Sequence, residues 1–158
     1  MTLKTRIAIL AGSGLGAGFL PFAPGTWGSL LALPLVWIFY TWGGLLTLAV
    51  FTVATCIISW WSTPPFERVY GEDPGPLVMD EIAGQSLCML LLFAFWNFDQ
   101  TIFIYASGFL FFRLFDITKI LGSENLQRIG GGAGVLLDDL LAGFYAHLAT
   151  GIVILSFI

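Results

Sequence analysis

The sequence predicts an all-α, polytopic integral membrane helical bundle with about five transmembrane helices. Of its 158 residues, 58% are hydrophobic and only 10% are charged, whereas soluble domains carry roughly 25% charged residues. A soluble chain of this length could not bury so much apolar surface. Aromatic residues make up 16% of the chain and include six tryptophans, which fits belts at the membrane interfaces. We interpret residues 1–158 as a single membrane-embedded domain.

The N-terminal part is apolar but interrupted. Residues 7–20 are short and dense in glycine, which favours a surface or re-entrant helix over a transmembrane span. The stretch L-P-F-A-P-G-T-W-G-S-L at residues 20–30 contains prolines and glycines that predict a rigid turn. Thr26 or Ser29 can cap the helix that follows. The free N–H groups of such a helix start also suit an anion.

The next long apolar run is too long for one membrane span of roughly 20 residues. Gly43 and Gly44 suit a turn in its middle, so we predict a helical hairpin with spans near residues 28–41 and 45–61. A proline-rich polar loop at residues 63–76 follows.

Three further spans are expected near residues 80–96, 101–115 and 135–157. The first two are joined by the short connection N-F-D-Q. The last is preceded by a second polar loop at residues 117–133. With the two spans of the hairpin, the chain has five predicted spans.

The charges support a topology in which the N-terminus is cytoplasmic. Both polar loops are then cytoplasmic, and all six Lys and Arg residues lie on that side, as the positive-inside rule requires. Asp99 is the one acidic residue on the opposite side. The net charge of −4 argues against nucleic acid as a partner.

Acidic residues stand in or beside the apolar runs at this cytoplasmic face: Asp80, Glu81, Asp116, Asp138 and Asp139. An unpaired carboxylate in such surroundings is costly, and a divalent cation is a fitting partner because hard cations take oxygen ligands. Arg113 and Lys119 add positive charge that can bind phosphate. Carboxylates that gather a metal, beside cations that bind phosphate, are the parts of a metal-dependent phosphoryl-transfer site.

Purely structural roles compete with this hypothesis. Asp80 and Glu81 also suit the N-terminus of a helix, where the macrodipole favours acids. Arg113 can form a structural salt bridge with Asp116. His147, the one histidine, lies deep in the last predicted span and is better read as a satisfied intramembrane side chain than as a catalyst.

Four stretches of the chain resemble the phosphatidylglycerophosphatase A family of bacterial membrane phosphatases. They are P-F-A-P-G-T-W-G-S-L (21–30), D-P-G-P-L-V-M-D-E-I-A-G (73–84), F-R-L-F-D-I-T-K (112–119) and G-G-G-A-G-V-L-L-D-D-L-L-A-G (130–143). They occur in the family's order over nearly the whole chain. One departure is the sequence K-I-L-G-S, which stands where the family usually has proline after the position of Lys119.

The resemblance implies hydrolysis of phosphatidylglycerophosphate to phosphatidylglycerol and inorganic phosphate, with Mg²⁺ as cofactor, at the cytoplasmic face of the bacterial inner membrane. It implies that the five acidic residues are metal-binding or catalytic. We expect Arg113, Lys119, Thr26 and Ser29 to bind the substrate phosphate. A metal-activated water and an aspartate that forms an aspartyl-phosphate both remain open as the nucleophile, and so does the oligomeric state.

Three other functions compete with this one. A CDP-alcohol phosphotransferase also places carboxylates at helix ends, but its D-G…A-R…G…D…D signature is absent from the sequence. A divalent-cation transporter would use intramembrane acids along its ion path, whereas these acids gather at one face. A structural subunit of the membrane would need neither the acids nor the two cations.

Overall fold

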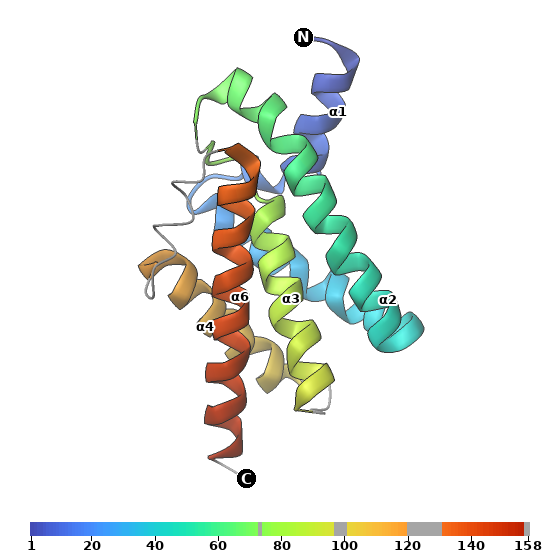
Figure 1. The fold of residues 1–158 in the computed structure, drawn as a ribbon, viewed down its shortest axis with the longest axis vertical. Coiled ribbons are helices and arrows are strands. Elements are labelled where there is room, and N and C mark those ends of the chain that lie inside the picture. Colours follow the sequence, from blue (N-terminus) through green and yellow to red (C-terminus); the bar gives the residue numbers. More distant parts are fainter. Residues whose placement is uncertain (73, 97–100, 120–130, 157–158) are drawn as a thin grey trace.

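The computed structural model describes residues 1–72, 74–96, 101–119 and 131–156, and the regular structure in these ranges is helical, without a β-strand (Figure 1). The elements are α1 (Leu3–Gly12), the short 3₁₀ helix η1 (Ala17–Phe19), α2 (Pro24–Tyr70), α3 (Met79–Phe95), α4 (Ile102–Thr118) and α6 (Gly131–Leu155). The all-α prediction is confirmed for these residues. The connection that holds Asp99 and residues 120–130 of the second polar loop lie outside them.

The longest helix, α2, is bent in the middle. Gly43 and Gly44 depart from helical geometry, and Gly44 has a φ of 67°, a left-handed conformation that glycine adopts without steric cost. The Thr47 hydroxyl donates to the carbonyl of Phe39 at 2.5 Å across the bend. The predicted hairpin is therefore present, with a first arm at residues 24–42 and a second arm at residues 45–70.

The second arm of α2 extends further than the sequence predicts. The polar loop expected from residue 63 begins only after Tyr70, and the helix continues through Pro64 and Pro65. Packing accounts for the difference, because Phe66 is fully buried in a cluster with Ile9 of α1 and Leu77. Burial of such an aromatic side chain outweighs the weak helix propensity of the local sequence.

The N-terminal helix and the start of α2 also differ from expectation. α1 begins at Leu3, where the Thr2 hydroxyl accepts a hydrogen bond from the Thr5 N–H at 3.2 Å, and it ends at Gly12 instead of running to residue 20. α2 begins directly at Pro24 with no side-chain cap at Ala23. The expected cap by Thr26 or Ser29 is therefore wrong, since proline at the first helical position already suits a helix start.

Two helices in the described part of the chain are long and apolar enough to cross a membrane. They are α2, with its two arms, and the stretch Gly132–Leu155 of α6. α3 and α4 have 17 residues each, slightly fewer than the roughly 20 that a span requires. The count of about five transmembrane helices is thus not confirmed.

Helix α3 occupies the centre of the molecule, between α6 and the second arm of α2 (Figure 1). Its buried side chains, among them Met89 and Leu92, join Phe112 of α4 and Ala146 of α6 in the main hydrophobic core. The starts of α3 and α6 lie side by side at one end of the molecule (Figure 1). This arrangement brings the two acidic pairs of the sequence together.

Candidate active site

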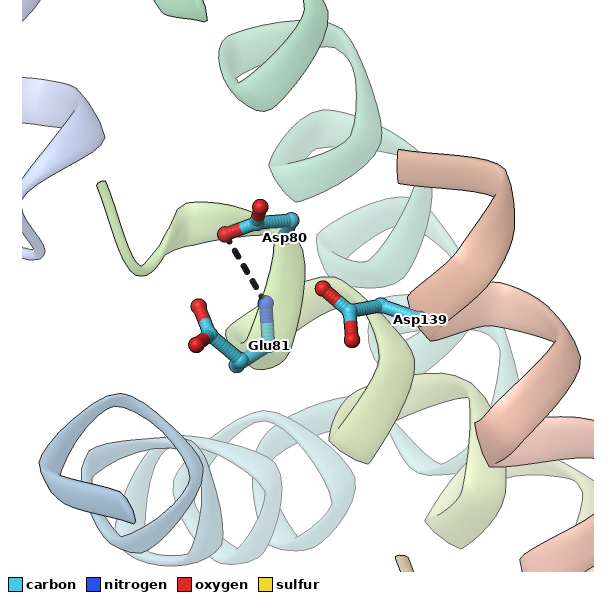
Figure 2. Close-up of side chains that lie close together, drawn as sticks. All are labelled: Asp80, Glu81 and Asp139. Atoms are coloured by element: carbon cyan, nitrogen blue, oxygen red, sulfur yellow. Dashed lines mark hydrogen bonds between the residues drawn. The ribbon is translucent and has the colours of Figure 1, made fainter. Parts of the chain in front are cut away.

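Three carboxylates converge where α3 meets α6. Asp80 and Glu81 lie in the first turn of α3, and Asp139 of α6 points toward them (Figure 2). Asp80 is 3% exposed and Asp139 5%. One oxygen of each of the three residues lies within 4.8 Å of the others. Two ionised carboxylates at this separation would repel each other by about 3–4 kcal/mol at an effective dielectric constant near 20. The three-carboxylate group therefore requires a positive ion or bound protons.

Glycines explain why α3 and α6 approach so closely at this point. A Cβ atom on Gly143 would lie 2.2 Å from the Gly84 carbonyl oxygen, and one on Gly84 would lie 2.5 Å from the Asp139 carbonyl oxygen. Only glycines fit at such a backbone crossing. Because Asp80 and Asp139 each stand four residues before one of these glycines, both share the contacting face of their helix. The repeated pattern of acid and glycine therefore builds the site.

An ion pair adjoins the acidic group on the side of α4. Arg113 forms an ion pair with Asp116 one turn later, and its Nη1 also donates to the Ser29 hydroxyl at 3.3 Å. Ser29 in turn donates to the Gly25 carbonyl at 2.8 Å. A Cβ on Gly25 would lie 2.1 Å from Glu81 Oε1 and 3.2 Å from Arg113 Nη1. Gly25 thus leaves the space in which Glu81 and Arg113 both approach the start of α2.

Lys119 supplies the second cation of the site. It is the C-cap residue of α4 in a left-handed conformation, a common way for a helix to end. Its ammonium group donates to Asp138 Oδ2 at 3.0 Å. The lysine is one third exposed and the aspartate is buried. Asp138 and Asp139 therefore have different partners, because neighbouring residues on a helix point about 100° apart.

A cavity of about 130 Å³ connects these groups. The five acidic residues singled out from the sequence all line it, together with Lys119. The remaining lining residues are Pro74, Gly75, Leu77 and Val135. The sequence did not single out these four as site residues, although the P-G-P run at residues 74–76 ends four residues before Asp80 and indicated a turn close to the acidic pair.

The other predicted residues lie at different places. Arg113, Ser29 and Thr26 are not among the described residues that line the cavity, although Ser29 contacts Arg113 beside it. His147 is buried on α6 two turns beyond Asp139, in contact with the rings of Phe95 and Phe144. That placement agrees with a structural role for the histidine.

The donor set fits a hard divalent cation. Such ions prefer carboxylate oxygens, and three carboxylates from two helices offer them within one small volume. In addition, Glu81 Oε2 is buried and has no hydrogen-bond partner among the described residues. A buried acceptor without a partner is costly, and a cation at this point would satisfy it.

Carboxylates that can gather a cation, beside cations that can bind an anion, suit cleavage of a phosphate ester, and long apolar helices suit a substrate carried by a lipid. The fold and the site thus define the class of helical lipid phosphatases. The sequence model of the family named phosphatidylglycerophosphatase A matches residues 10–154. The chain belongs to this family, and it is a phosphatase of the phosphatidylglycerophosphatase type.

Named relatives agree on the enzyme class. A Bacteroides thetaiotaomicron protein, provisionally named a phosphatidylinositol-3-phosphatase, is 35% identical over 153 residues, which cover 94% of each chain. The Escherichia coli phosphatidylglycerophosphatase A is 30% identical over 82% of this chain and 73% of its own. The Haemophilus influenzae phosphatidylglycerophosphatase A is 29% identical over 92% and 87%. No solved structure matches the chain significantly.

Proposed function

We propose that the protein hydrolyses phosphatidylglycerophosphate to phosphatidylglycerol and inorganic phosphate in a reaction that depends on Mg²⁺. The observation that carries this proposal is the group of Asp80, Glu81 and Asp139 in a cavity that also receives Lys119. Two named relatives carry the corresponding enzyme name. The lipid phosphate would enter the cavity from the end of the molecule at which α3 and α6 begin.

Asp80, Glu81 and Asp139 are the proposed metal ligands. Their oxygens are close enough to share one ion, and the burial of Asp80 and Asp139 keeps them in place. A bound Mg²⁺ supplies Lewis-acid polarisation and neutralises phosphate charge. Asp116 and Asp138 line the same cavity and were expected to contribute to metal binding; here each also holds a cation in position.

Arg113 and Lys119 are the proposed phosphate-binding groups. The Nε atom of Arg113 is buried without a hydrogen-bond partner among the described residues, so the guanidinium group has an unused donor that a small rotation of the side chain would turn toward a phosphate oxygen. Ser29 orients this group through its 3.3 Å contact. Lys119 is held by Asp138 at the cavity wall. The N-terminus of α2 with Thr26 remains a proposed auxiliary anion site.

We propose a membrane-embedded arrangement with about five spans in the bacterial cytoplasmic membrane and a cytoplasmic active site. Supporting it are the apolar lengths of α2 and α6 and the distribution of the cations. Lys119 lies at the end of α4, and Lys4, Arg6 and Arg68 lie on α1 and near the end of α2. The acidic group gathers at this same end and not along the membrane depth, which argues against an ion-transport path.

Cysteine labelling tests this topology. In a background with Cys56 and Cys88 replaced by alanine, we expect Glu72→Cys to react with an impermeant maleimide only from the cytoplasmic side. Thr101→Cys should react only from the opposite side. Both positions are exposed. Reaction of both variants from the same side would contradict the five-span arrangement.

Phosphate release tests the reaction itself. Purified protein should release phosphate from dihexanoyl phosphatidylglycerophosphate with Mg²⁺ and lose this activity in excess EDTA, with recovery when Mg²⁺ is restored. Phosphatidylinositol 3-phosphate of the same chain length is the comparison, because the Bacteroides relative carries that name. Preference for the inositol lipid would reassign the substrate. Undiminished release in EDTA would remove the metal from the proposal.

A further inference from the structure

An apolar groove runs between α4 and the first arm of α2. Its volume is about 340 Å³, and it is lined by Leu33, Pro34, Trp37, Ile102 and Tyr105. Tyr105 is buried and Leu33 partly buried against the main core, so they form the floor. Trp37 and Ile102 are 54% and 85% exposed and form the rims. The groove belongs to neither the acidic cavity nor the ion pairs around it.

The same two helices carry the proposed phosphate-binding contact further along. Ser29 on α2 and Arg113 on α4 are joined by a hydrogen bond of 3.3 Å. Leu33 and Trp37 follow Ser29 by four and eight residues, so they share its side of α2. Ile102 precedes Arg113 by eleven residues, close to three full turns, and shares its side of α4. The helix pair is thus polar at one end and grooved and apolar at the other.

The length of the apolar part matches one leaflet of a membrane. The rise along a helix places Trp37 about 12 Å beyond Ser29, and Ile102 about 16 Å from Arg113. The hydrocarbon core of a bilayer is roughly 30 Å thick, so one leaflet measures about 15 Å. A single molecule with an anionic head at the Ser29–Arg113 contact would therefore place an acyl chain beside these groove residues.

We propose that this groove binds an acyl chain of the phospholipid substrate while its phosphate lies at the Ser29–Arg113 contact, beside the acidic cavity. The inference rests on the proposed function and adds a binding site for the second half of the substrate. Charge complementarity at the polar end identifies the occupant as a phospholipid anion. Binding of the remote chain would align the phosphate with the cations, because binding energy from non-reacting parts of a substrate can be used for orientation.

The experiment compares two chain lengths of one substrate. Leu33→Trp fills the floor of the groove, and Ile102→Trp adds bulk at a rim position that is 85% exposed. With dioleoyl phosphatidylglycerophosphate in mixed micelles, each variant should lower kcat/KM by about tenfold, the cost of displacing two or so buried methylenes. With the dihexanoyl substrate, whose chains are too short to fill the groove, kcat/KM should be unchanged.

A matched control is Val53→Trp, which adds the same ring at a position 58% exposed on the second arm of α2. It should leave both substrates unchanged. Equal effects of the groove variants on both chain lengths, or no effect on either, would overturn the proposal. A changed oligomeric state together with equal losses would assign the groove to contact between copies of the chain. Failure of the wild type to hydrolyse the dihexanoyl lipid would instead refute the proposed function.

Discussion

Asp139→Asn is expected to lower the rate of phosphate release by on the order of 10²–10³-fold, the usual cost of removing one group that stabilises charge in a transition state. Asparagine keeps the volume and one acceptor oxygen but removes the charge from the three-carboxylate group. Added Mg²⁺ should restore activity only in part, because the missing charge acts on the transition state as well as on metal binding. The measurement is phosphate release across a Mg²⁺ titration.

Thermal stability gives a second measurement on the same variant. Asp139 lies among acids that repel one another, so removing its charge should leave the metal-free protein equally stable or more stable. Mg²⁺ at one hundred times its dissociation constant would stabilise the wild type by about 2.7 kcal/mol. A tenfold weaker affinity in the variant would remove about 1.4 kcal/mol of that increment. A metal-free protein that is clearly destabilised by the substitution would contradict the crowding argument.

Asp138→Asn is the matched control, since it makes the same chemical change at the neighbouring residue. Asp138 contacts Lys119 at 3.0 Å and does not join the three-carboxylate group. Activity should again fall strongly, because Lys119 loses the partner that positions it. The Mg²⁺-dependent stabilisation should fall less than in Asp139→Asn. Near-normal activity in both variants, with unchanged Mg²⁺ stabilisation, would refute the assignment of this pair to the site.

The sequence predicts the convergence of the acids well. Charged residues are so rare in the apolar runs that their positions mark helix ends, and alternating directions of the runs bring those ends to one side. The bend at Gly43 and Gly44 was predictable for a similar reason, since the run was too long for one span. Both predictions depend only on where charged residues and glycines fall along the apolar runs, and this can be read directly from the sequence.

The sequence did not predict that Asp138 contacts Lys119 while Asp139 joins the three-carboxylate group. This difference depends on the rotation of α6 about its axis. Two adjacent acids look equivalent until one knows which face meets α3. The close contact between Gly143 and Gly84 settles that rotation. The indication was present in the sequence, since Asp139 and Gly143 repeat the four-residue spacing of Asp80 and Gly84. It could not be used until the two glycines were known to meet.

The second arm of α2 extends beyond its predicted end, because the prolines near that end predict a loop. Pro64 and Pro65 are strong local indications of a loop, but Phe66 and Thr63 are both fully buried. The packing partners of Phe66 come from α1 and from the segment before α3. Such contacts between distant segments do not appear in a local window. The same limitation explains why Gly25 and Gly28 looked like turn residues, although they allow α2 to approach Glu81 and Val78.

Arg113→Lys is expected to lower kcat/KM by about 10²-fold or more while the protein remains folded. The guanidinium group bonds Ser29 and Asp116 at once and keeps a buried Nε donor without a partner among the described residues. A lysine ammonium is a point charge that cannot reproduce this planar fork. It would preserve the pairing with Asp116 but lose the geometry for phosphate, so inorganic phosphate should also inhibit the variant more weakly than the wild type.

A purely structural ion pair makes the opposite prediction for this residue. If Arg113 only stabilises α4 through Asp116, lysine should retain most of the activity, because it keeps a positive charge beside Asp116. Both side chains are only about 15% exposed, so the pair is largely buried, and removal of one charge would destabilise the protein strongly, whereas lysine keeps the charge. Full activity of Arg113→Lys, with unaltered inhibition by phosphate, would therefore exclude the guanidinium group from phosphate binding and leave Lys119 as the cation that performs it.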